Sequence, residues 1–267
     1  MVNVIHKRDR GVDREQLRRL FDMTGRVVIV TGGTRGIGRA LAEGFAAAGA
    51  RVVVASRKAE ACRETEAHLR RMGGDALGVP THLGDLAALR ALVERTVDAY
   101  GGIDVVVNNA ANALALPHGA YTPEAWAKSL DVNLRGPVFL VQEALAALKR
   151  SPHAAVLNLV SGAAFLFAVN QSMYAAAKAA LMAFTRSMAA EFAPHCIRVN
   201  ALSPGTIDTD MVRKNPAEAQ AEMKKMQLLP RIASPDEMVG PALLLTSDAG
   251  SFITGQVLFA DGGMVPR

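Results

Sequence analysis

The chain has 267 residues, half of them hydrophobic but only 5% aromatic, and a formal net charge of +5. This length suits one α/β domain with a large core, and the many small aliphatic side chains suit close packing of helices on a sheet. The positive charge is modest and spread along the chain, which argues against a nucleic-acid surface and favours an anionic cofactor.

Residues 1–20, "MVNVIHKRDRGVDREQLRRL", are predicted to be a solvated extension with one short helix, preceding a single main domain at 21–267. The extension lacks the apolar core of a signal peptide, and no apolar run reaches the roughly 20 residues that span a bilayer. We therefore expect a cytoplasmic protein with neither a membrane nor a nucleic-acid partner. Cys62 and Cys196 have no metal-ligand spacing, so we expect both to be reduced and packed, and we expect no metal site.

Seven short runs rich in Val and Ile favour buried strands, at 26–30, 51–56, 76–80, 103–109, 154–160, 197–202 and 256–261. Helix-length segments separate most of them, for example 37–48, 59–71 and 86–100. Continuous apolar strands that alternate with helices are typical of a parallel sheet covered on both faces. The predicted fold is therefore α/β, a single doubly wound Rossmann-type domain.

The segment 206–233 departs from this alternation. It follows a predicted strand, contains Met211, Met223 and Met226 among many charged residues, and has no strand-like run. A long connection of this kind is often functional in a compact domain. We predict a mobile lid of loop and helix over the substrate.

A glycine-rich turn, "TGGTRGIG" at 31–38, joins the first predicted strand to a predicted helix. Glycines let the backbone turn tightly and approach a pyrophosphate, and the positive end of the helix holds the negative charge. The spacing is G-x-x-x-G-x-G, which differs from the general G-x-G-x-x-G fingerprint. Taken alone, the motif also fits a strand-to-helix turn without a ligand.

The stretch "SMYAAAKAAL" at 172–181 places Tyr174 and Lys178 on the same face of a predicted helix. An ammonium fixed beside a phenol lowers the phenol's pKa from its ordinary value of about 10, which suits acid–base chemistry near neutrality. The alternative is that both side chains reach solvent.

Three motifs in this order, T-G-x-x-x-G-x-G, "NNAA" at 108–111 and Y-x-x-x-K, resemble the short-chain dehydrogenase/reductase family. Further matches are "VNL" at 132–134, "SPGTIDT" at 203–209 and "FITGQVLFADGG" at 252–263, so the resemblance covers about 21–263. It implies a seven-stranded parallel sheet, a nicotinamide cofactor across the sheet's C-terminal edge, and a homotetramer.

The resemblance also implies a catalytic tetrad of Asn133, Ser161, Tyr174 and Lys178. Tyr174 would give a proton to the oxygen of a ketone that accepts hydride, while Ser161 hydrogen-bonds the same oxygen. We expect the charge of Lys178 to lower the pKa of Tyr174. By analogy with the family, Lys178 would also bind the nicotinamide ribose and relay protons through a water near Asn133.

The cofactor contacts that the resemblance implies are Gly32, Thr34, Arg35, Gly36, Ile37, Gly38, Ser56, Arg57, Leu83, Asn109, Ala110, Tyr174, Lys178, Pro204, Gly205, Ile207 and Thr209. Relatives that use NAD end the second strand with an Asp, whereas this chain has Ser56 followed by Arg57. An Asp would repel a ribose 2′-phosphate, and Ser and Arg accept it. With Arg35 in the glycine turn, the pattern favours NADP over NAD, unless both arginines are merely solvated.

Adenine recognition departs from the family pattern. The family usually has an Asp near the third strand that binds the adenine amino group, and His82 stands there in "PTHLGD". The backbone of Leu83 could hold the adenine instead, and His82 could stack on it or hydrogen-bond to it. A lone histidine is also often structural.

The predicted cleft rim is apolar, with "AANALALPH" at 110–118 and "AAFLFAV" at 163–169. Phe165 and Phe167 could line a substrate pocket or make core or oligomer contacts. The pattern favours an NADP(H)-dependent carbonyl reductase or secondary alcohol dehydrogenase for a small, apolar substrate. A 3-oxoacyl thioester reductase of lipid metabolism is the alternative on the same scaffold, and a nicotinamide-binding sensor or scaffold without turnover is the alternative of another class.

Overall fold

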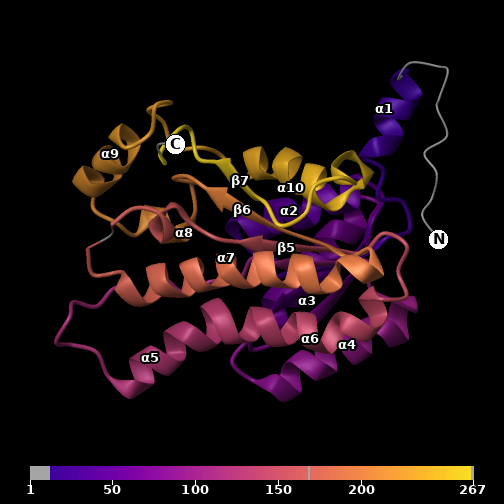
Figure 1. The fold of residues 1–267 in the computed structure, drawn as a ribbon, viewed down its shortest axis with the longest axis horizontal. Coiled ribbons are helices and arrows are strands. Elements are labelled where there is room, and N and C mark those ends of the chain that lie inside the picture. Colours follow the sequence, from indigo (N-terminus) through magenta and orange to yellow (C-terminus); the bar gives the residue numbers. More distant parts are fainter. Residues whose placement is uncertain (1–12, 168, 266–267) are drawn as a thin grey trace.

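The computed structural model describes residues 13–167 and 169–265. Its centre is a parallel seven-stranded sheet in the order β3-β2-β1-β4-β5-β6-β7 (Figure 1). The strands are β1 Val27–Thr31, β2 Arg51–Ser56, β3 Asp75–Pro80, β4 Val105–Asn108, β5 Ala155–Leu159, β6 Arg198–Pro204 and β7 Val257–Ala260. Each predicted strand is confirmed within a few residues. The strand order reverses between β1 and β4, where open α/β sheets form their ligand crevice.

Helices connect the strands and cover both faces of the sheet (Figure 1). They are α1 Arg14–Leu20, α2 Gly36–Ala47, α3 Ala59–Arg71, α4 Leu86–Tyr100, α5 Pro123–Leu130, α6 Gly136–Leu148, α7 Ser172–Phe192, α8 Asp210–Arg213, α9 Ala217–Lys225 and α10 Val239–Thr246. A π-helical turn, Asp131–Arg135, lies between α5 and α6. None of the helices in the described ranges is both long and apolar enough to cross a membrane.

Alternation along each strand divides the core into two layers. In β1, Val28 packs into the layer formed with α2, α3 and α10, and Ile29 packs into the layer formed with α4, α6 and α7. A parallel sheet covered on both faces has strands that are mainly apolar, as the sequence pattern predicts. Polar side chains with a functional role are therefore expected at the strand ends and in the loops that follow them.

A buried chain of hydrogen bonds fixes α7 against the sheet. The side chain of Asn108, at the end of β4, donates to Oδ1 of Asn158 at 2.9 Å, and Asn158 donates to Oγ1 of Thr185 at 2.9 Å. All three side chains are buried. Because α7 also carries Tyr174 and Lys178, this chain helps to hold those two residues at a fixed position relative to β4 and β5.

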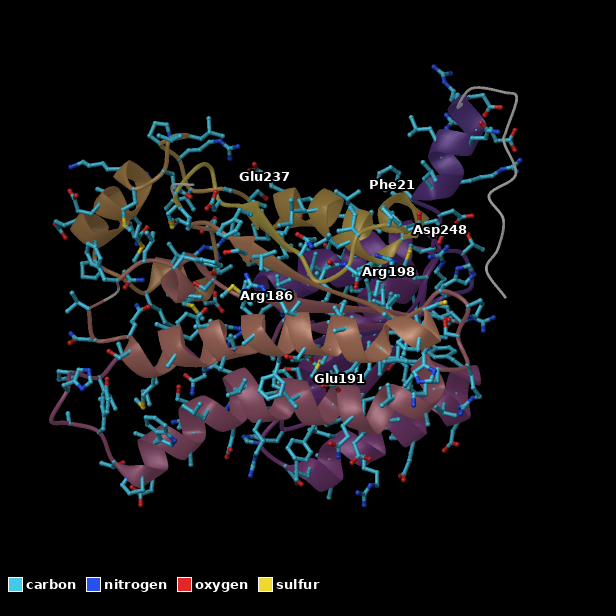
Figure 2. All side chains as sticks on the ribbon, in the orientation of Figure 1. Phe21, Arg186, Glu191, Arg198, Glu237 and Asp248 are labelled. Carbon is cyan, nitrogen blue, oxygen red and sulfur yellow. The ribbon has the colours of Figure 1, made fainter. Side chains whose placement is uncertain are left out.

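The short helix predicted in the extension is present as α1, which stands away from the sheet (Figure 1). Asp13 and Gln16 form a capping box at its start. Phe21 caps its end, and Figure 2 shows Phe21 on the same side of the molecule as Asp248, far from α8 and α9. Residues 1–12 of the predicted extension lie outside the described residues.

The two cysteines have different surroundings. Cys62 on α3 is buried, as predicted, and its thiol contacts the carbonyl oxygen of Ser56. Cys196 is exposed, so the prediction that it is packed is wrong. It is the left-handed residue, with φ of 58°, that ends the short turn Ala193–His195 ahead of β6. That turn lies at the surface, and its side chains therefore stay outside the core.

Candidate active site

Tyr174 and Lys178 lie near the start of α7 and are both buried, with 8% and 1% of their surface exposed. Nζ of Lys178 lies 5.7 Å from the centre of the Tyr174 ring and donates to the carbonyl oxygen of Leu159 at 2.7 Å. The predicted pairing on one helix face is confirmed. The alternative in which both side chains reach solvent is wrong.

Burial sets the protonation of this pair. It raises the pKa of Tyr174, and a hydrogen bond with Ser161 offsets that rise only in part. It also lowers the pKa of Lys178 from 10.5 to about 8. The expected net lowering of the Tyr174 pKa is wrong for this structure, because desolvation outweighs the other influences on the phenol. Tyr174 is therefore protonated at neutral pH, the form that can donate a proton.

Ser161 follows β5 by two residues and begins the short turn Gly162–Ala164. Its hydroxyl oxygen accepts the N–H of Ala163 at 3.2 Å, as an N-cap does. The same side chain hydrogen-bonds Tyr174. The turn therefore fixes the Ser161 hydroxyl beside the phenol, where both groups can reach one substrate oxygen.

Asn133 lies in the π-helical turn Asp131–Arg135 and is fully buried. Its amide nitrogen donates to the carbonyl oxygens of Asn112 at 2.7 Å and Ser129 at 2.9 Å, and its amide oxygen accepts the N–H of Asn112 at 2.9 Å. Asn133 thus fastens the loop after β4 to the turn between α5 and α6. π-helical turns occur frequently at functional sites. The predicted water relay through Asn133 stays a prediction.

The glycine-rich turn packs too closely for side chains. A Cβ at Gly38 would lie 2.3 Å from Nδ2 of Asn109, and one at Gly32, whose φ is +66°, would lie 2.9 Å from Cα of Ala110. Asn109 also donates to the carbonyl oxygen of Thr31 at 2.8 Å. The turn after β1 is therefore held directly against the residues that follow β4, at the point where the strand order reverses.

The start of α2 fits a bound anion. Arg35 occupies the N-cap, and among the described residues no side chain caps the first turn of the helix. Gly36, with φ of +51°, leads into it. The uncapped N–H groups of a first helical turn and the positive end of the helix favour a phosphate. With the close approach at Gly32 and Gly38, this turn fits the pyrophosphate of a dinucleotide, as the motif predicts.

Two cations and two hydroxyls gather where β1 and β2 end. The hydroxyl of Thr34 donates to Oγ of Ser56 at 3.1 Å. Arg57 is exposed and has no ion-pair partner in the described part of the chain. Arg35 forms an ion pair with Asp210, its Nη1 lying 3.3 Å from Oδ2. Ser56, and not a carboxylate, stands at the end of β2. A site without a carboxylate at this position is the kind expected to bind NADP.

His82 supports the backbone at the expected adenine position. Its Nδ1 accepts the N–H of Gly84 at 3.1 Å, so the imidazole closes a small turn while remaining exposed. This contact agrees with the structural alternative for His82. The Leu83 side chain is buried among the apolar residues of α4 and α6. Adenine contact through the Leu83 backbone stays a prediction.

The segment after β6 returns to the start of α2. Gly205 donates to the carbonyl oxygen of Ala260 at 3.1 Å, and a Cβ there would lie 2.6 Å from the side chain of Gln227. Beyond it, the methyl group of Thr209 lies 3.1 Å from the Cβ position of Gly36. The expected contacts Pro204, Gly205, Ile207 and Thr209 therefore run from the end of β6 towards the glycine-rich turn.

The predicted lid 206–233 has its two ends side by side. Asp208 donates to the carbonyl oxygen of Ala233 at 2.9 Å, Ala233 donates to that of Thr206 at 3.0 Å, and the side chain of Gln227 accepts the N–H of Thr206 at 2.9 Å. Between these ends, α9 contributes no buried residue. The segment lies at one end of the molecule with the described C-terminal residues beside it (Figure 1). Its predicted mobility stays a prediction.

Asp261 is a positioning residue that sequence reasoning did not single out. It is buried, and its carboxylate accepts the N–H groups of Gly263 at 2.9 Å and Val265 at 3.0 Å. The turn places the sulfur of Met264 3.1 Å from the Cβ position of Gly162, next to Ser161. The signal was present in "FADGG", because Asp before glycines favours a side-chain-stabilised turn.

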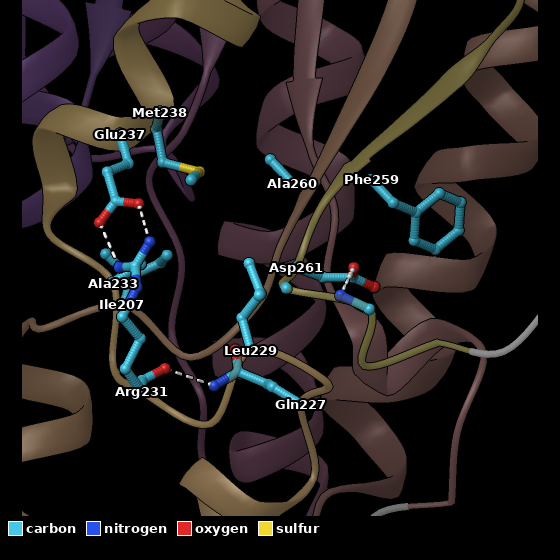
Figure 3. A pocket seen from close by; sticks show the side chains of 12 residues that line it. Ile207, Gln227, Leu229, Arg231, Ala233, Glu237, Met238, Phe259, Ala260 and Asp261 are labelled. Carbon is cyan, nitrogen blue, oxygen red and sulfur yellow. Dashed lines mark hydrogen bonds and ion pairs between the residues drawn. The ribbon is translucent and has the colours of Figure 1, made fainter.

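A cavity of about 270 Å³ lies between β7 and the second half of the lid (Figure 3). Gln227, Leu229, Arg231, Glu237 and Asp261 are among its lining residues. The guanidinium of Arg231 donates to both carboxylate oxygens of Glu237, at 2.6 and 2.7 Å. No member of the tetrad is among the described residues that line the cavity.

The aromatic residues of the predicted rim have different surroundings. The ring of Phe165 packs on that of Phe259 in β7, with centroids 4.7 Å apart. Phe167 is 97% exposed. Phe165 is itself 36% exposed, so this contact lies at the surface of the domain and not in its core. Phe167 is available to a ligand or to another copy of the chain.

Known proteins share this arrangement. A family model described as enoyl-(acyl carrier protein) reductase matches residues 32–265. The chain is 36% identical over 249 residues to the 2,5-dichloro-2,5-cyclohexadiene-1,4-diol dehydrogenase of Sphingobium indicum, covering 91% of this chain and 98% of that protein. It is 34% identical over 243 residues to the 3-oxoacyl-acyl-carrier-protein reductase of Aquifex aeolicus, with the same coverage.

Solved structures agree with the fold. A proposed NAD(P)-dependent gluconate 5-dehydrogenase from Beutenbergia cavernae, with NADP bound at low occupancy, matches with a TM-score of 0.88 and 34% identity over 93% of this chain and 100% of that one. A short-chain type dehydrogenase/reductase from Mycobacterium marinum matches with a TM-score of 0.88 and 31% identity, over 93% and 98% of the two chains. The chain belongs to the short-chain dehydrogenase/reductase family, whose members are NAD(P)-using oxidoreductases of CH–OH and C=O groups.

Proposed function

We propose that this protein reduces apolar ketones to secondary alcohols, or catalyses the reverse oxidation, with NADP(H) as its cofactor. The observation that carries the proposal is the buried phenol of Tyr174 with the half-buried Ser161 next to it, because burial keeps the phenol protonated and the Ser161 side chain lies beside it. A proton donor with a hydroxyl next to it is suited to a carbonyl oxygen that gains negative charge.

The chain's own residues would carry the proton side of the reaction. Ser161 and Tyr174 would both hydrogen-bond the carbonyl oxygen, which orients the ketone, and Tyr174 would transfer its proton to that oxygen as charge develops there. The bound nicotinamide supplies the hydride that reaches the carbonyl carbon. The buried ammonium of Lys178 stabilises the phenolate that Tyr174 leaves behind, because an opposite charge nearby favours the charged form.

The preference for NADP rests on Arg35, Ser56 and Arg57. A 2′-phosphate on the adenosine ribose would meet two guanidinium groups and a hydroxyl, and no carboxylate at the end of β2. Guanidinium groups bind phosphate with strong charge-assisted hydrogen bonds. The relative from Beutenbergia cavernae with bound NADP supports the same preference.

A 3-oxoacyl thioester reductase is the second candidate. The matching family description and the relative from Aquifex aeolicus both name acyl-carrier-protein substrates. The dehydrogenase from Sphingobium indicum instead acts on a small cyclic diol. The apolar rim with its exposed Phe167 suits either an acyl chain or a cyclic ketone. A sensor without turnover would have no need of the buried Tyr174–Lys178 pair. A homotetramer and a cytoplasmic location stay predictions.

Oxidation of NADPH and NADH, measured with a panel of substrates, tests the proposal. The panel pairs free cyclic and aromatic ketones with 3-oxoacyl thioesters of coenzyme A and of acyl carrier protein. We expect turnover of free ketones with NADPH preferred. Turnover confined to thioesters would favour the second candidate, and NADPH binding without turnover of any member would favour the sensor.

A further inference from the structure

One ion pair joins the cofactor turn to the lid. Nη1 of Arg35, at the N-cap of α2, lies 3.3 Å from Oδ2 of Asp210, the first residue of α8. The two residues are 175 positions apart in the sequence. Within residues 13–167 and 169–265, this is the only ion pair between the N-cap and helix of α2 and the lid 206–233.

Arg35 and Asp210 are left to pair with each other. The neighbouring charges are already paired, since Arg213 binds Asp208 at 2.7 Å and Arg39 binds Glu43 at 2.9 Å. A cavity of about 200 Å³ opens between the first turn of α2 and the start of α8, with Asp210 in its wall. Solvent can therefore reach the carboxylate of Asp210. Of the Arg35 and Asp210 side chains, 68% and 51% are exposed.

In the proposed NADP site, Arg35 has a second anionic partner, the ribose 2′-phosphate. A ribose 2′-phosphate held between Arg35 and Arg57 would take the guanidinium as its own partner, and the carboxylate of Asp210 would then be a like charge near the phosphate. Arg35 cannot satisfy both anions fully. The phosphate carries more charge than a carboxylate and has three acceptor oxygens, so it is the stronger competitor.

We propose that Asp210 is a cofactor-discriminating residue, which holds Arg35 until the 2′-phosphate of NADP displaces it. Binding of that phosphate then frees the start of α8 from α2, and so releases one end of the lid. Asp210 lowers the affinity for NADP and leaves the affinity for NAD unchanged. This inference rests on the proposed preference for NADP.

Calorimetric titration of the full chain with adenosine 2′,5′-bisphosphate and with adenosine 5′-monophosphate tests the first half. An exposed ion pair is weak, so its loss should change affinity only modestly. We expect Asp210→Asn to lower the dissociation constant of the bisphosphate by about two- to fivefold and to leave that of the monophosphate unchanged. Asp236→Asn is the matched control, because Asp236 lines the same cavity and has no ion pair with Arg35. In an Arg35→Gln background, Asp210→Asn should have a much smaller effect, because only the like-charge repulsion between Asp210 and the phosphate is then removed.

The outcomes separate this inference from the proposed function. If the wild-type chain prefers the bisphosphate and loses that preference in Arg35→Gln, but Asp210→Asn matches wild type, the NADP preference stands and the role of Asp210 is overturned. If Asp210→Asn and Asp236→Asn raised the affinity for the bisphosphate equally, the cause would be the loss of any nearby negative charge. The specific role of Asp210 would then be overturned as well. Equal affinity of the wild-type chain for both nucleotides would overturn the preference and the inference together.

Hydrogen exchange tests the second half. The amides of Val212, Arg213 and Lys214 are bonded within the first turn of the lid, to the carbonyl oxygens of Thr209 and Asp210. We expect the bisphosphate, and not the monophosphate, to speed their exchange in the wild-type chain. In Asp210→Asn they should exchange fast without any nucleotide. If neither nucleotide changed the exchange rates of these amides, the Arg35–Asp210 ion pair would not be what holds α8 in place.

Discussion

Nζ of Lys178 donates to the carbonyl oxygen of Leu159 across 2.7 Å, which joins α7 to the last residue of β5. Ser161 follows Leu159 by two residues, so this bond sets the distance between the helix that carries Tyr174 and the strand end that carries Ser161. Lys178 is thus a positioning residue as well as a charge. Both roles depend on an ammonium that is almost completely buried.

The buried ammonium should make the free energy of unfolding depend on pH. Because burial lowers the pKa of Lys178 to about 8, the unfolded chain holds this proton between about pH 8 and 10.5 while the folded chain releases it. Stability therefore rises with pH in that window, by about 2 kcal/mol between pH 7 and 9.5. Denaturant unfolding at the two pH values should show this rise in the wild-type chain and its loss in Lys178→Met. An equal rise in both proteins would mean that Lys178 is not its source.

Tyr174→Phe should abolish turnover and leave cofactor binding nearly intact. The change removes the proton donor and keeps the ring that packs beside Lys178. General acid catalysis contributes about 10²–10⁴-fold, so kcat should fall by that factor. Steady-state rates with a reactive diketone measure it, and titration with NADPH provides the control. A rate within a few fold of wild type would remove Tyr174 from the proposed mechanism.

Arg57→Asp should shift the cofactor preference from NADPH towards NADH. A carboxylate at the end of β2 would repel the 2′-phosphate and could accept hydrogen bonds from free ribose hydroxyls. The effect should appear in the KM for each cofactor more than in kcat. Lys58→Asp is the matched control, because Lys58 is also exposed and adjacent. If both variants behave alike, Arg57 makes no specific contact with the phosphate.

Asn133→Ala should lower both stability and kcat. The substitution leaves the N–H and carbonyl oxygen of Asn112 and the carbonyl oxygen of Ser129 without their partner. Buried groups that lose their partners cost about 1–3 kcal/mol, which denaturant unfolding measures. Ser129→Ala is the control, because it removes only a side-chain contact at 3.5 Å. A kcat loss without a stability loss in Asn133→Ala would point to the water relay instead of positioning.

The sequence predicted the fold well because its signals are local. Each of the seven apolar runs has strand length, and the glycines at 32, 36 and 38 and the Tyr174–Lys178 spacing are short patterns. Contacts between distant segments leave no such pattern. The Arg35–Asp210 pair and the bond from Lys178 to Leu159 depend on how loops and strand ends meet after folding. The pKa of Tyr174 is raised where the sequence predicted that it would be lowered. The sequence could not show this, because the burial that raises it is a property of the whole fold.

The lid 206–233 should be protected from hydrogen exchange only when cofactor and ketone are both bound. Between its joined ends, α9 contributes no buried residue and Met226 and Leu228 are 52% and 84% exposed, so few contacts hold the segment in place. Flexible apolar side chains can adapt to a hydrophobic ligand once the lid closes.

The measurement compares exchange without ligand, with NADPH and with NADPH plus a substrate-like ketone. We expect the amides of α9 to exchange fast without ligand and to slow in the complex with both ligands, while the amides of β5 stay protected throughout. Lids of this kind exclude water and gate product release. Strong and equal protection of α9 in all three states would identify the segment as a fixed wall, and the range of substrates would then be set by the rigid rim around Ser161 and Phe165.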